Sequence, residues 1–125
     1  MYFFSNTIPI TSSQIVAAEK HFNVQLPTSL RTIILEHNGA SVECESGRMS
    51  ALISFSEKES GNVYDRYALP SGYIPFGDDG AQGCYSVSAD ENEGIILWMK
   101  GVEKSVVAKD FDSFLRWLDE ECKVK

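Results

Sequence analysis

The spacing of apolar residues changes twice along this chain, and these two changes constrain the fold more than any other feature of the sequence. Up to residue 39, apolar side chains recur every three or four positions, which is typical of helices with one buried face. Between residues 41 and 108 they alternate within short runs, as in antiparallel strands, and from residue 110 the helical spacing returns. Residues 1–125 are therefore predicted to form one α+β domain, with two N-terminal helices, a mainly antiparallel sheet of about five or six short strands and one C-terminal helix.

Local signals place the first two helices. Thr11 and Gln14 have the spacing of a capping box, so we expect a helix over residues 12–22. A second helix is predicted from a cap at Thr28 to Asn38-Gly39, because these residue types commonly begin and end helices.

The strands expected in the middle of the chain are short. They cover residues 41–43, 49–55, 74–76, 84–88, 94–99 and 105–108. Pro75 cannot donate a backbone hydrogen bond, so its strand should be an edge strand or contain a bulge. Residues 56–68 fit either a short helix or a loop. Asp110 or Asp112 should cap the last helix, whose inward residues are predicted to be Phe111, Phe114, Leu115 and Leu118.

The chain is acidic, and its acidic residues are unevenly distributed. It has 11 Lys and Arg against 18 Asp and Glu, a net charge of −7, and no basic residue between Arg66 and Lys100. Five carboxylates fall in that interval: Asp78, Asp79, Asp90, Glu91 and Glu93. Such a surface repels nucleic acids and anionic membranes and attracts a basic protein, so neither nucleic acid nor membrane is expected as a partner. An acidic face that contacts only solvent is the alternative.

The sequence favours a protein of the cytoplasm. The apolar run at Tyr2–Phe4 is short and has no basic residues before it, unlike a secretory signal, and no run could span a bilayer. Cys44, Cys84 and Cys122 contain no CxxC pair, so neither a disulfide framework nor a thiolate zinc site is indicated. We expect one or two of them to be small buried hydrophobic residues in a reducing compartment, with Cys84 reactive only if it is exposed.

The segment Gly77-Asp78-Asp79-Gly80 could be a ligand loop or a turn. In an extended segment the two carboxylates would point to opposite sides, and the calcium-loop spacing fails both here and at Asp90–Gly94. Glycine permits positive φ, and aspartate can bond its own backbone. We therefore interpret the segment as a turn within the sheet, with a cation as the alternative, and predict no metal and no cofactor.

No motif in the chain indicates catalysis. The phosphate-binding P-loop, the HExxH zinc motif and the GxSxG nucleophile motif are all absent from the sequence. His21 and His37 fall on different predicted helices and fit a surface or helix-terminal role. The chain is therefore expected not to be an enzyme.

Aromatic residues are frequent in the middle of the chain. Most should belong to the core or to cross-strand pairs, because aromatic rings suit half-buried sheet faces. Rings beside carboxylates also suit a protein–protein surface. Tyr73, Tyr85 and Trp98 are the candidate anchors of such a surface.

The order of these motifs resembles that of the SUKH superfamily, the Smi/Knr-type domains. The resemblance covers roughly residues 9–120. It begins with Ile15 to Glu19, Leu26-Pro27 and Asn38-Gly39, continues through the central Ile74-to-Tyr85 segment, and ends at the helix Asp112–Leu118. The family often has a second glycine where this chain has Ala40, and residues 56–67 match weakly.

The resemblance implies an α+β binding protein without catalytic activity. Many bacterial members are cytoplasmic immunity proteins that bind and block a cognate toxin, often a nuclease. We therefore expect a toxin as the partner, a basic nuclease domain being favoured by the charge, and a monomer in the free state. The partner-binding residues expected are Asp78, Asp79, Asp90, Glu91, Glu93, Tyr73, Tyr85 and Trp98. The alternative is a regulatory or scaffold domain that binds an endogenous partner.

Overall fold

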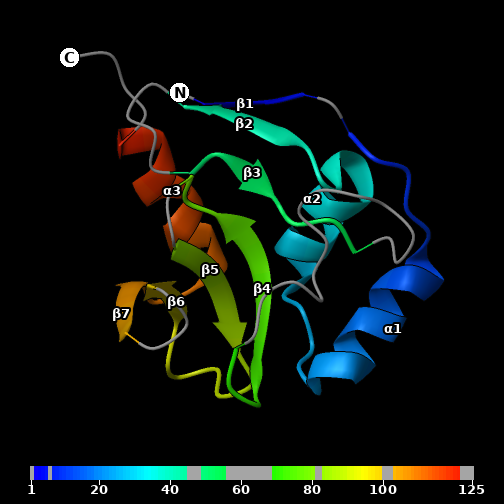
Figure 1. Cartoon of the computed structure of the whole chain (residues 1–125). Coiled ribbons are helices and arrows are strands. Elements are labelled where there is room, and N and C mark those ends of the chain that lie inside the picture. Colours follow the sequence, from blue (N-terminus) through cyan, green and yellow to red (C-terminus); the bar gives the residue numbers. More distant parts are fainter. Residues whose placement is uncertain are drawn as a thin grey trace.

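In the part of the chain that the structure describes, seven strands form one antiparallel sheet in which each strand pairs with its neighbour in sequence (Figure 1). The computed structural model describes residues 2–5, 7–44, 49–55, 69–80, 83–99 and 103–121. The elements are β1 (Tyr2–Ser5), α1 (Ser12–Phe22), α2 (Thr28–His37), β2 (Ser41–Cys44), β3 (Ala51–Leu52), β4 (Tyr73–Asp78), β5 (Gly83–Ser88), β6 (Ile95–Met99), β7 (Glu103–Ala108) and α3 (Phe111–Glu121). The α+β class and the positions of the three helices are confirmed. The strand count is higher than predicted, because β1 pairs with β2 and was not foreseen.

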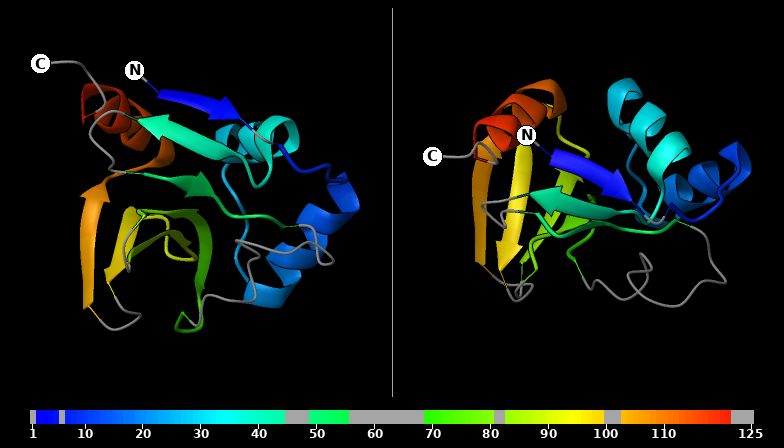
Figure 2. Two further views of the ribbon diagram at one scale, coloured as in Figure 1. Left: turned by 45° about the horizontal axis from the view of Figure 1, so that its top comes forward. Right: turned by 90° about the horizontal axis from the view of Figure 1, so that it is seen from above.

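The helices lie on one face of the sheet and enclose a single core with it (Figure 2). Alternate residues of β4, β5 and β6 point toward the helices. The largest fully buried side chains of this core include Ile15, Leu30, Ile34, Ile74, Phe76, Tyr85, Phe114 and Leu118. Burial of such apolar surface is the main stabilising term of the fold. None of the helices in the described part of the chain is long and apolar enough to cross a membrane.

The helix ends follow the local sequence with one exception. Thr11 forms the expected capping box with Gln14, and Asn23 ends α1 in the left-handed conformation at φ 56°. In α2, however, Thr28 is the first helical residue, and the cap position is held by Pro27, which has no side chain to bond the free amides. The prediction of a Thr28 cap was therefore wrong. Proline is favoured beside the start of a helix because its fixed φ suits it.

The predicted strand over residues 49–55 is mostly irregular. Only Ala51–Leu52 forms a strand, and all side chains from residue 51 to residue 55 are buried rather than alternating. At the end of the segment the backbone bonds Asn38 instead of a strand: this fully buried residue accepts a hydrogen bond from the Phe55 backbone through its amide oxygen at 2.8 Å. Its amide nitrogen donates to the Ile8 carbonyl and to the Ser54 hydroxyl. The sequence could not distinguish this side-chain pairing from a strand ladder. The ambiguous segment 56–68 lies outside the described residues.

The centre of the sheet is the pair of hairpins formed by β4, β5 and β6. The ladder between β4 and β5 shifts register between Pro75 and Gly77, which confirms the bulge expected at this proline. From β4 to β7 the sheet curls, as the left view of Figure 2 shows. The curl brings side chains of β4 and β7 together on the face that the helices do not cover.

Candidate functional site

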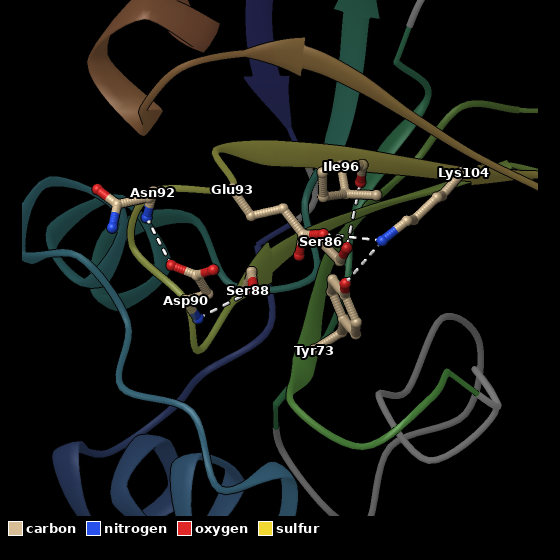
Figure 3. Close-up of polar contacts among 8 residues, drawn as sticks. All are labelled: Tyr73, Ser86, Ser88, Asp90, Asn92, Glu93, Ile96 and Lys104. Atoms are coloured by element: carbon tan, nitrogen blue, oxygen red, sulfur yellow. Dashed lines mark hydrogen bonds and ion pairs between the residues drawn. The ribbon is translucent and has the colours of Figure 1, made fainter.

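The turn between β5 and β6 carries three of the predicted partner-binding carboxylates. Asp90 accepts a hydrogen bond from the Asn92 backbone at 3.0 Å, and the Ser88 hydroxyl accepts one from the Asp90 backbone at 3.0 Å (Figure 3). These bonds fix the turn and leave the Asp90 and Glu91 side chains exposed. Glu93 is less exposed because it is turned toward β7.

Asp90 and Glu91 line a groove of about 500 Å³ at one end of the sheet. Two other segments complete its walls: the link from α1 to α2, over residues 25–29, and the corner from β7 into α3, over residues 109–112. Four exposed carboxylates therefore surround the groove, which we call the acidic groove: Asp90, Glu91, Asp110 and Asp112. Lys109 is the one basic residue among the lining residues.

Asp110 also has a structural role at the groove. Its carboxylate accepts a hydrogen bond from the Ser113 backbone at 2.7 Å, which confirms it as the cap of α3. Hydrogen bonds from Ser113 hold the pKa of Asp110 below its usual value, so this carboxylate remains charged. Asp112, in the first turn of α3, is not tied in this way and is the better residue to alter in an experiment.

A second group of polar and aromatic residues lies on the face that the helices do not cover. The Lys104 ammonium on β7 donates to Glu93 at 2.8 Å and to the Tyr73 hydroxyl on β4 at 3.3 Å (Figure 3). Tyr73 packs edge-to-face on Trp98, with ring centroids 5.1 Å apart. We call Tyr73, Glu93, Trp98 and Lys104 the lysine cluster.

The lysine cluster depends on the curl of the sheet. β4 and β7 are separated by two strands, so in a flat sheet their backbones would be roughly 14 Å apart. The β6–β7 register places Lys104 opposite Trp98, and the curl turns both toward Tyr73. Hydrogen bonds from Lys104, then from the Tyr73 and Ser88 hydroxyls, hold the pKa of Glu93 at about 2. Hydrogen bonding to Glu93 in turn raises the pKa of Lys104 and of Tyr73.

Asp78 and Asp79 lie at the other end of β5, roughly 20 Å from the Asp90 turn. Their carboxylates accept backbone hydrogen bonds from Gly80 at 2.7 Å and from Gly83 at 2.8 Å. Gly80 has φ +85°, so the segment has the predicted character of a turn. Among the described residues, no three His, Cys, Asp or Glu side chains are grouped closely enough to hold a metal ion.

The three candidate aromatic anchors are divided between the two faces. Tyr73 and Trp98 belong to the lysine cluster. Tyr85 is 1% exposed and packs in the core against Phe76 and Phe114, with ring centroids 6.2 and 5.1 Å away. Tyr85 therefore packs in the core and does not present its ring to a partner.

Cys84 is buried on β5. Burial, followed by the nearby carboxylates of Asp78 and Asp79, raises the pKa of its thiol far above the usual value. The thiolate is the reactive form, so Cys84 is expected to be inert in the folded protein.

Sequence reasoning did not identify Lys104 or the groove. The interval between Arg66 and Lys100 has no basic residue, but the fold places the ammonium of Lys104 against Glu93, which belongs to that interval. The lysine could have been placed opposite Trp98 from hairpin register alone. The contact with Tyr73 could not, because it depends on the curl.

The residues that carry the sequence motifs lie in this fold at capped α1, at the link Leu26-Pro27, at the end of α2, where Gly39 but not Asn38 is left-handed, and in the amphipathic α3. The chain matches the SMI1 / KNR4 family (SUKH-1) over residues 9–117. It belongs to this family. The SUKH-1 match includes the lysine cluster and all four carboxylates of the acidic groove, whereas β1 precedes it. A comparison with curated proteins finds no match.

Proposed function

We propose that this SUKH-1 protein is an immunity protein that binds a toxin protein in the cytoplasm and neutralises it by steric and electrostatic occlusion. Membership of a family known for immunity proteins supports a binding role without catalysis. The observation that carries the proposal is the acidic groove, where two turns distant in sequence present exposed carboxylates around one concavity.

The groove suits a basic partner in shape and in charge. A concave surface can accept a protruding side chain or loop, and its carboxylates raise the rate of encounter with a positively charged protein. A nuclease domain is favoured as the toxin, because its nucleic-acid site is basic and carboxylates oppose that charge as phosphates do. Occlusion of that site would block access of the nucleic acid.

The two turns at the ends of β5 contribute differently to this proposal. Asp90 and Glu91 are assigned to the toxin contact, together with Asp112. Asp78 and Asp79 bond their own backbone and lie roughly 20 Å from the groove. A partner that buried the groove and both turns would need a large interface, so we propose Asp78 and Asp79 as peripheral contacts.

The test is rescue of cells that express the toxin. Immunity genes lie directly downstream of toxin genes, so the adjacent upstream reading frame supplies the toxin to be expressed. Co-expression of this protein should restore growth, and the purified proteins should form a one-to-one complex. If the neighbouring gene encodes no toxin and the protein instead captures a basic regulatory protein of its own cell, the alternative role as a scaffold or regulatory domain holds.

A further inference from the structure

The lysine cluster has the components of a binding site for a cationic side chain, and Lys104 occupies it. The ammonium of Lys104 lies 5.7 Å from the centroid of the Tyr73 ring and 6.0 Å from that of the Trp98 ring. Its charge is balanced by Glu93 at 2.8 Å. Two electron-rich rings and one carboxylate are the groups that recognise ammonium and guanidinium ions in proteins.

We propose that Tyr73, Trp98 and Glu93 form a receptor site for an arginine side chain of a protein partner, and that Lys104 is an intramolecular occupant which this arginine displaces. That the arginine belongs to the toxin rests on the function proposed above. That the site binds a guanidinium group does not depend on it and is tested separately.

Lys104 is held in a way that permits displacement. About half of its side chain, 49%, is exposed to solvent, so water and salt compete for the same contacts. Its ammonium is carried on a flexible stem, from β7 at the edge of the sheet. Arginine fits the same site better because its planar guanidinium can bond Glu93 through two parallel hydrogen bonds and stack on a ring.

Two features beside Lys104 favour an incoming partner. Trp98 is 6% exposed, and its indole N–H is buried with no hydrogen-bond partner in the described part of the chain. Lysine has only donors and cannot satisfy this group, whereas a partner segment also brings backbone carbonyls. Val106, two residues along β7 and therefore on the same face, is 64% exposed and gives the partner an apolar contact.

Protection of the sheet edge is the competing explanation for Lys104. Charged residues on edge strands prevent pairing between copies of a chain. That role requires only a charge pointing into solvent. It does not explain why the ammonium is directed inward onto two rings and a carboxylate, and it predicts self-association rather than cation binding when the charge is removed.

The test uses N-acetyl-arginine amide as the probe and the full chain carrying Lys104→Met, which retains an unbranched apolar stem. Binding is followed by NMR through the indole N–H of Trp98, with the indole N–H of Trp117 on α3 as the internal reference. The variant should show a saturable shift at Trp98, with a dissociation constant at least about tenfold lower than that of the unmodified protein. N-acetyl-lysine amide should bind more weakly, and the further change Glu93→Gln should abolish binding.

Three results would overturn the proposal. These are a folded Lys104→Met variant without a saturable shift at Trp98, equal shifts at Trp98 and Trp117, and binding that survives Glu93→Gln. Concentration-dependent dimerisation of the variant without arginine binding would assign Lys104 to edge protection instead. If Lys104→Met does not fold, Lys104→Gln removes the same charge and is tested in the same way. Arginine binding without toxin rescue would leave this site intact and reject only the proposed function.

Discussion

The ammonium of Lys104 lies 2.8 Å from a carboxylate oxygen of Glu93, eleven residues earlier in the chain. The contact joins the end of the β5–β6 turn to the start of β7. It also places a positive charge beside a carboxylate of the interval between Arg66 and Lys100, which has no basic residue of its own. Glu93 is therefore paired, whereas Asp90 and Glu91 of the same turn remain available to a partner.

The pairing predicts an unusually acidic Glu93. Its pKa should lie near 2 rather than at the usual 4.5, because Lys104 and two hydroxyl groups stabilise the carboxylate. Carbon-detected NMR titration of the side-chain carboxyl measures this value directly. In Lys104→Met the midpoint of Glu93 should rise toward 4.5, because the main hydrogen bond that stabilises its carboxylate is lost.

The same shift has a defined effect on stability. Because the pKa of Glu93 is lower in the folded state, its contribution to the free energy of unfolding is fully present above about pH 4.5 and declines as the pH falls toward 2. Denaturation curves between pH 2 and 6 should therefore differ less between the original protein and Glu93→Gln at the acidic end. An equal difference at every pH would contradict the assignment.

Two glycines with positive φ, Gly94 and Gly72, test how closely the chain packs at the end of β7, where the corner into α3 begins. Gly94 has φ +86°, and a Cβ there would lie 2.3 Å from the backbone oxygen of Ala108. Gly72 has φ +91°, but its nearest neighbour would be the Ala89 Cβ at 4.0 Å. Gly72→Ala should cost about 1–2 kcal/mol of unfolding free energy from backbone strain alone. Gly94→Ala should cost at least about 1 kcal/mol more because the corner must shift; equal losses in chemical denaturation would refute the clash.

Asn38 should be among the most sensitive polar residues of the protein. Its side chain is fully buried and bonds three groups from distant segments, on Ile8, Ser54 and Phe55. Asn38→Ala removes these partners and should lower the free energy of unfolding by about 2–4 kcal/mol. Asn92→Ala, in the exposed β5–β6 turn, is the control and should change it by less than about 0.5 kcal/mol.

The buried thiol of Cys84 should resist modification. In a Cys44→Ser, Cys122→Ser variant, where Cys84 is the only thiol, an aromatic disulfide reagent should not react with the folded protein up to pH 9. Its pKa is raised by burial, so almost no thiolate is present to react. Addition of guanidinium chloride should give rapid, complete reaction. Rapid reaction under native conditions would mean that β5 is not covered as described.

The helices were more predictable from sequence than the strands, for physical reasons. Thr11 and Gln14 form their capping box within four residues. The spacing of Phe111, Phe114 and Leu118 predicts which face of α3 is buried. Such signals are local. β1 has no comparable signal, because four residues become a strand only through pairing with β2. Residues 51–55 appear to alternate in sequence, but buried Asn38 bonds where a ladder was expected.

The candidate surfaces were predictable only in part. The acidic turn Asp90–Glu93 and the aromatic residues Tyr73 and Trp98 were identified from residue type and spacing. Two features could be seen only in the folded structure. Asp112 of α3 lines the same groove as the acidic turn, and Asp78 lies away from that groove. Both depend on which ends of antiparallel strands meet, and charge along the sequence carries no such information.

The assignment of the acidic groove to the toxin contact is tested by comparing two variants with the same net charge for their affinity to the upstream-encoded toxin. The groove variant carries Asp90→Asn, Glu91→Gln and Asp112→Asn, and leaves the Asp110 cap in place. The control variant carries Glu36→Gln, Glu43→Gln and Asp119→Asn, the first and last lying toward the opposite ends of α2 and α3.

Calorimetry should show that the groove variant binds about tenfold or more weakly, with a smaller dependence on salt, because steering and groove contacts are both reduced. The control variant should bind within about threefold of the original protein, because distant surface charges act weakly through salt-screened solvent. Equal affinities for the two variants would contradict the assignment of the groove. Absence of any complex between the original protein and that toxin would contradict the proposed function itself.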